Sequence, residues 1–139
     1  MRMRKEIKMS EKVMEWRLQA AAVKRLKHHP EYGKSFLLAG DMNAGRRTVG
    51  QAGIAKATGM ISGEPDLRIY ILGGKLGMIE YKRTKNYLSS EQRRRHSELR
   101  GLGFDYIEVI TADTEIEAAD ATVDLVCSWL PVYKRKNCK

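Results

Sequence analysis

Hydrophobic residues recur with a helical period near the start of the chain. Residues 10–28 contain no Gly or Pro, and Val13, Trp16, Ala20 and Val23 lie three or four positions apart. This spacing places the four side chains on one face of a helix, so we predict that they pack into the core.

A second row of the same helix begins polar and ends apolar. Glu15 and Gln19 are followed at the same spacing by Ala22 and Leu26. We therefore expect Glu15 and Gln19 to lie one turn apart at the edge of the buried side.

The centre of the chain predicts β-strands. Residues 35–39 form a short apolar run, and residues 67–72 and 76–82 flank a Gly-Gly turn. Two such segments around a glycine turn are typical of a β-hairpin. The glycine-rich segment 40–63 predicts a long loop with a helical turn in it.

The C-terminal half predicts a helix, a strand and a second helix. Ser89 and Gln92 have capping-box spacing, so we expect a helix that ends at Gly101 or Gly103. Residues 104–111 predict a strand.

The last predicted helix covers residues 114–130 and stops at Pro131. Its expected apolar face consists of Ile116, Ala119, Val123, Val126 and Leu130. The order of elements predicts an α/β fold with a central mixed β-sheet flanked by α-helices. We expect one domain over residues 1–139, with its core at about 10–131 and a solvated basic tail at 132–139.

The formal net charge of +9 favours a polyanionic partner. Nucleic acid is the first interpretation, and an anionic membrane surface is the second. Candidate contacts to a nucleic-acid backbone are Arg46, Arg47, Lys85, Arg93 and Arg94. The arginine run at 93–95 fits a solvated helix face equally well, and the loop at 40–63 fits a mobile surface loop.

Cysteine and histidine usage argues against a metal-binding knuckle. Cys127 and Cys138 form no CxxC motif, and His28, His29 and His96 lack metal-ligand spacing, so we interpret the histidines as surface or phosphate-side residues. We expect reduced cysteines and, without a signal-peptide core or an apolar membrane span, a cytoplasmic protein.

The hairpin carries charged side chains on strands that otherwise look buried. Side chains alternate along a strand, so Glu80 and Lys82 project from one face, and Asp66 at the far end of the first strand lies near them. Two neighbouring carboxylates repel each other unless a cation lies between them. Mg²⁺ or Mn²⁺ fits this position, with the backbone carbonyl of Tyr81 as a further ligand.

This arrangement suits phosphodiester hydrolysis. Lys82 would stabilise the attacking hydroxide or the charge on phosphorus. Glu15 would hold a metal-bound water or a second ion, and Gln92 would orient Lys82 or the water. Two simpler interpretations stay open: Gln92 serves only as a helix cap, and the Glu-x-Lys pattern is a solvated strand face.

Taken together, four segments resemble a known family. The segments EWRLQ, GMISGEPDL, GMIEYK and LSSEQRRRHSELRGLGF occur in this order. They resemble the VRR-NUC domain of the PD-(D/E)XK, restriction-endonuclease-like nuclease superfamily. The resemblance implies a metal-dependent nuclease in which Asp66 and Glu80 bind metal and Lys82 is the catalytic lysine.

The resemblance also assigns Glu15 as the acid of the first helix, with Glu11 one turn earlier as the alternative, and Gln92 as the glutamine after the strand. Small stand-alone members occur in phages and bacteria, and some dimerise and act on branched DNA such as four-way junctions. We thus expect a homodimeric endonuclease in a bacterial or phage-infected cell, with no small-molecule cofactor. Alternatives are a non-catalytic nucleic-acid-binding module and a nuclease that acts on RNA.

Overall fold

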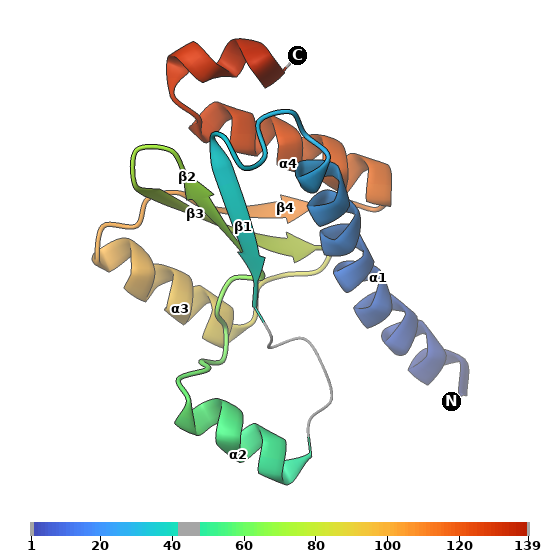
Figure 1. Ribbon diagram of the computed structural model, residues 1–139. Helices are drawn as coiled ribbons and strands as arrows, with labels where there is room; N and C mark the ends of the chain where they lie inside the picture. Colours follow the sequence, from blue (N-terminus) through green and yellow to red (C-terminus); the bar gives the residue numbers. More distant parts are fainter. Residues whose placement is uncertain (1, 42–47, 139) are drawn as a thin grey trace.

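The computed structural model describes residues 2–41 and 48–138, with side chains described from residue 15 onward. Over these described residues, four β-strands form one sheet among four α-helices and a C-terminal 3₁₀ helix (Figure 1). The elements are α1 (Arg2–Lys27), β1 (Phe36–Gly40), α2 (Val49–Ala57), β2 (Leu67–Ile71), β3 (Lys75–Lys82), α3 (Ser90–Gly101), β4 (Ile107–Thr111), α4 (Glu115–Trp129) and η1 (Val132–Cys138).

The sheet is mixed, as the sequence predicts. Its strand order is β1-β2-β3-β4. The first three strands pair antiparallel, and β4 pairs parallel to β3 after a crossover through α3. Because β2 begins beside the middle of β3, with Leu67 opposite Ile79, the end of β3 extends past the start of β2.

Helices cover both faces of the sheet, giving three layers (Figure 1). On one face, α1 and α4 pack against each other and against the alternate β3 residues Ile79 and Tyr81. On the other face, Leu99 of α3 packs against Met78 and Ile107. The alternation expected for β3 is therefore confirmed.

The structure corrects the first predicted face of α1. Trp16 is 51% exposed, and the buried row is Leu18, Ala22 and Leu26. The second predicted row is the one that turns inward, because helix packing selects one of two adjacent stripes that periodicity alone does not distinguish. Ile116 of α4 is exposed as well, and with Trp16 it lines an open groove between α1 and α4.

Two connecting segments are more ordered than predicted. The loop at 40–63 contains the nine-residue helix α2, which starts at a capping box of Thr48 and Gln51 and buries none of its residues. The basic tail forms η1, and a disulfide joins its Cys138 to Cys127 of α4. The tail is mostly exposed, as expected, although it is ordered. The expectation of reduced cysteines was wrong in this structure, because the 3₁₀ turn returns Cys138 to α4.

Within the described part of the chain, no helix is both long and apolar enough to cross a membrane.

Candidate metal-binding and catalytic site

Asp66 lies at the start of β2, where it contacts the overhanging end of β3. Its Oδ2 accepts a hydrogen bond from the backbone N–H of Tyr81 at 2.8 Å. Its backbone carbonyl accepts bonds from Gln19 Nε2 at 3.1 Å and from the Asp41 N–H at 2.9 Å. These bonds fix Asp66 relative to α1, β1 and β3, so the carboxylate is held in place before any ligand binds.

Glu80 is buried on the α3 side of β3 and is only 1% exposed. Its Oε1 shares a hydrogen bond with His96 Nε2 at 3.2 Å, and His96 is equally buried. The interpretation of His96 as a surface or phosphate-side residue was therefore wrong. It faces inward because the helix that carries it lies over Glu80.

The other oxygen of Glu80, Oε2, receives no hydrogen bond from a donor among the described residues. A buried carboxylate oxygen without a donor is costly, so native structures provide it with a proton or a cation. In the metal-free protein, burial raises the pKa of Glu80 to about 10, and the hydrogen-bonding and negative charge of Asp66 act in the same direction. Lys82 partly offsets this shift in the Glu80 pKa.

His96 is held in its neutral form. Burial lowers the pKa of its imidazole, and the nearby Arg100 guanidinium lowers it further. When Glu80 is ionised, a neutral His96 donates its Nε2–H to Oε1 and leaves Oε2 available for a metal ion.

The side-chain hydroxyl and the backbone groups of Tyr81 point in different directions. Its hydroxyl lies in the α1–α4 layer, where it hydrogen bonds with Thr122 at 2.9 Å, and burial raises its pKa. Its N–H points towards Asp66, and the N–H and C=O of one residue in an extended strand project to the same edge. The Tyr81 carbonyl therefore points to the edge where Asp66 lies, as the expected ligand set requires.

These groups fit Mg²⁺ or Mn²⁺. Hard divalent cations take oxygen ligands, and Mg²⁺ combines one or two protein carboxylates with waters and substrate phosphate. Asp66, Glu80 and the Tyr81 carbonyl supply such a set. Among the described side chains, the one group of three possible ligands within 4.8 Å of one another is elsewhere, at His29, Cys127 and Cys138.

Lys82 and Glu15 also face this region. Lys82 is half-buried at the end of β3, and its charge acts on Glu80. Glu15 accepts a hydrogen bond from Asn86 Nδ2 at 2.8 Å, and its charge raises the Glu80 pKa slightly. The side chain of Glu11 lies outside the described residues, so the choice between Glu15 and Glu11 stays a prediction.

Gln92 acts as a helix cap in this structure. Its Oε1 accepts from the Ser89 N–H at 2.9 Å, and its own N–H donates to Ser89 Oγ at 3.1 Å. The capping box predicted from the sequence is confirmed. A role for Gln92 in orienting Lys82 or water stays a prediction.

A close backbone contact joins the Asp66 loop to α3. Gly63 has φ +85°, and a Cβ there would lie 2.5 Å from the carbonyl oxygen of Glu91, which only glycine avoids. Glu64 binds Arg95 through two bonds of 3.2 Å and Arg68 through one of 3.1 Å. The contact and the ion pairs fix Asp66 and His96 relative to each other.

The candidate nucleic-acid contacts divide into two groups. Lys85, Arg93 and Arg94 are exposed, as such contacts require. Arg46 and Arg47 lie outside the described residues. Arg95, the third arginine of the run, turns inward to Glu64.

Sequence reasoning missed His96, Asp41 and Asn86 as neighbours of the site. The spacing of four residues between Gln92 and His96 was a usable signal, because it places both on the side of α3 that faces the strand. Asp41 carried a weaker signal, since it directly follows a predicted strand.

The comparisons with known proteins are sparse. No protein-family model matches the chain, and no curated protein matches it. One solved structure, described as a "VRR_NUC domain", is 21% identical, with a TM-score of 0.48 and an alignment that covers 79% of this chain and 94% of that one. Its description names the family that the sequence motifs resemble. A likeness this loose carries no activity with it.

Proposed function

We propose that this protein is a Mg²⁺- or Mn²⁺-dependent endonuclease that hydrolyses DNA phosphodiester bonds. The observation that carries the proposal is the buried Glu80, whose Oε2 lacks a donor among the described residues and whose carboxyl group interacts with Asp66. A binding module has no need for a carboxylate that is costly to bury and repels phosphate. A site for a divalent cation explains both features.

Asp66, Glu80 and the Tyr81 carbonyl would hold the ion, which supplies charge to the phosphate and lowers the pKa of a bound water. Lys82 extends from the same face of β3 as Glu80 and would donate to the attacking oxygen or to a phosphate oxygen, where negative charge develops. His96 holds Glu80 so that Oε2 keeps its direction. Glu15, fixed by Asn86, would accept a hydrogen bond from a water of the ion.

DNA is the proposed substrate, supported by the net charge of +9 and by exposed basic residues on α3 and after β3. We further propose branched DNA, such as four-way junctions, and a homodimer, as the family resemblance implies. Two active sites related by a two-fold axis would make paired cuts in opposite strands.

The test uses a panel of four-way junction, flap, nicked, single-stranded and linear duplex DNA, with RNA of matched sequence. Each substrate is incubated with Mg²⁺, with Mn²⁺ and with a chelator, and the products are separated on denaturing gels. We expect cleavage only with a divalent ion and fastest on the junction, and a dimer by sedimentation. Binding in chelator without cleavage under any condition would instead identify a binding module, and faster cleavage of RNA would reject DNA as the substrate.

A further inference from the structure

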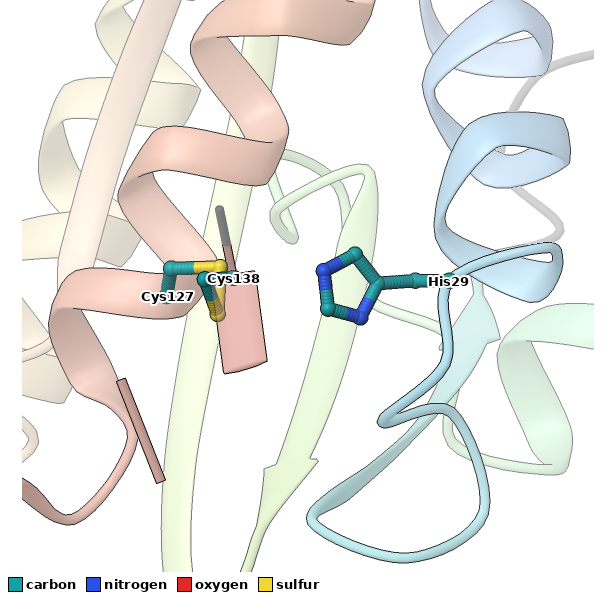
Figure 2. A group of neighbouring side chains, drawn as sticks. All are labelled: His29, Cys127 and Cys138. Carbon is teal, nitrogen blue, oxygen red and sulfur yellow. A yellow bond between two sulfur atoms is a disulfide. The ribbon is translucent and has the colours of Figure 1, made fainter. Parts of the chain in front are cut away.

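His29, Cys127 and Cys138 form a cluster outside the acidic site (Figure 2). They come from the loop after α1, from α4 and from the end of η1, and the two cysteines are joined by a disulfide. One ring nitrogen and the two sulfur atoms lie within 4.8 Å of one another, and all three residues are half-buried.

A hydrogen bond determines which ring nitrogen of His29 carries its proton. Nδ1 accepts from the backbone N–H of Glu31 at 3.1 Å, so the neutral ring carries its proton on Nε2. Figure 2 shows Nε2, the nitrogen farther from the Cβ attachment, directed towards the two sulfurs. A histidine that binds metal through Nε2 donates from Nδ1, and here Nδ1 faces a donor. The geometry therefore favours an N–H donor to sulfur over a metal ligand.

We propose that Cys127 and Cys138 form a reversible disulfide, a site of thiol–disulfide exchange with small dithiols, in which His29 stabilises the thiolate of Cys138. A thiolate of the dithiol attacks Cys127 Sγ, the Cys127–Cys138 bond breaks, and the electron pair leaves on Cys138. The second thiolate of the dithiol then attacks the dithiol sulfur that is bonded to Cys127. Cys127 is released and takes a proton from water. Two electrons thus pass from the dithiol, which becomes a disulfide, to the protein.

The position of Cys127 in its helix assigns the leaving thiolate to Cys138. Cys127 lies in the last turn of α4, where the free carbonyl ends of the helix disfavour negative charge. His29 Nε2 lies within 4.8 Å of both sulfurs, and in the reduced protein its N–H would be available to the sulfur that carries the charge. Cys138 also packs against the main hydrophobic core, so the sulfurs stay close after reduction and the bond can form again.

The exchange site lies away from the acidic site. His29 contacts Phe36 at the first residue of β1, with ring centroids 6.0 Å apart, whereas Asp66 bonds to Asp41, directly after the last residue of β1. Reduction would therefore loosen the attachment of η1 to α4 and leave the acidic site unchanged. On the basis of the proposed function, we expect the same rate of DNA cleavage in both redox states.

The first experiment uses the full chain, reduced with a phosphine and freed of metal with a chelator. The rate of alkylation by iodoacetamide is followed against pH for the unmodified protein, for His29→Asn and for the control His28→Asn. His28 is exposed and bonds only to the Lys24 carbonyl among the described residues, so its replacement changes no contact with sulfur. We expect alkylation near neutral pH to fall about five- to tenfold in His29→Asn, with a higher thiol pKa, and to be unchanged in the control.

A second pair of variants keeps the test informative if His29→Asn does not fold. In Cys127→Ser the free thiol is Cys138, and in Cys138→Ser it is Cys127. The proposal requires faster alkylation of Cys138 than of Cys127 at neutral pH. It also requires that the disulfide of the unmodified protein open and close reversibly in glutathione buffers of different reducing strength, as measured by intact mass. Equal reactivity of the two thiols, or a disulfide that never forms with oxidised glutathione, would overturn it. So would Zn²⁺ binding by the reduced protein that protects both thiols, because it would identify a metal site.

Discussion

His96 Nε2 and Glu80 Oε1 lie 3.2 Å apart, and each residue is 1% exposed. One oxygen of the carboxylate thus bonds to α3, and the other receives no donor from the described residues. A rigid ligand of this kind binds a cation without the loss of side-chain entropy that a mobile glutamate would suffer.

Replacing His96 should weaken metal binding more than a comparable change in the same layer. We expect His96→Ala to lower the free energy of unfolding by about 2–3 kcal/mol and to raise the Kd for Mn²⁺ about tenfold. The control is Leu99→Ala, which truncates a buried residue of α3 that packs on Met78 and makes no hydrogen bond to Glu80. Calorimetric titration with Mn²⁺ below the unfolding temperature separates the two effects. Equal Mn²⁺ affinity in the two variants would show that His96 only fills space.

The buried Glu80 should make the metal-free protein less stable as pH rises. Burial raises the pKa of Glu80 from the ordinary 4.5 to about 10, so between these limits the folded state holds a proton that the unfolded state has lost. The free energy of unfolding therefore decreases with pH, by about 1.4 kcal/mol per pH unit at most. This slope is measured by urea unfolding in the presence of a chelator at pH 5.5, 7 and 8.5. Most other side chains keep their charge over about this range.

Glu80→Gln removes the titrating group and should flatten that slope. The matched control Glu108→Gln, at an exposed position on β4, should keep it. Added Mn²⁺ should restore stability most at the highest pH, where the ion replaces the missing proton. A slope that Glu80→Gln leaves unchanged would mean that another group causes it.

Lys82 should contribute to the chemical step rather than to binding. We expect Lys82→Ala to reduce the single-turnover cleavage rate by about 100-fold, as the loss of a donor to developing charge does. Its DNA affinity, measured by fluorescence anisotropy with Ca²⁺, should change by no more than about twofold. The exposed Lys85 gives the opposite pattern, so Lys85→Ala should weaken binding and its salt dependence while the cleavage rate at saturation is kept. Cleavage by Lys82→Ala at the unmodified rate would remove Lys82 from the site.

Two capping boxes in the chain allow the two roles of Gln92 to be separated. Gln51 caps α2 as Gln92 caps α3, and α2 has no buried residue. Gln92→Ala and Gln51→Ala each remove a cap, at a cost of about 1 kcal/mol for a cap that supports the fold. If Gln92 also orients water or Lys82, cleavage at saturating metal and DNA should fall about tenfold in Gln92→Ala alone. Full cleavage by both folded variants would leave capping as the role of Gln92.

Gly63 should tolerate no side chain, whereas Gly53 should. At Gly63, alanine meets the Glu91 backbone at a positive φ, so we expect Gly63→Ala to lower the free energy of unfolding by about 3 kcal/mol. Gly53 lies inside α2 with no atom within 4 Å of a new Cβ, and Gly53→Ala should stabilise its helix by about 0.5–1 kcal/mol. Thermal unfolding of the two variants gives the comparison. A Gly63→Ala protein as stable as the unmodified one would disprove the close contact.

Local patterns predicted the elements of this fold better than their orientations. The hairpin, the cap at Ser89 and the alternation along β3 follow from residues that are neighbours in the chain or on one strand. The exposure of Trp16 and the burial of His96 depend on which helix lies over which face, and that is settled by packing between distant segments. The predicted site shows the same division. Strand alternation placed Glu80, but its partner His96 required the docking of α3.

Two bonds at the centre of the acidic site join residues that are close in sequence, although the bonds from Gln19 to Asp66 and from Asn86 to Glu15 span 47 and 71 residues. Asp66 and Tyr81 are 15 residues apart, and Glu80 and His96 are 16 apart, whereas the contact of Arg25 with Asp120 between α1 and α4 spans 95 residues. Short loops close at a lower entropic cost than long ones, so folding that starts at the hairpin would assemble the ligands before the two ends of the chain meet. Pulse-labelled hydrogen exchange should then find the amide of Tyr81 protected earlier than the amides of α4.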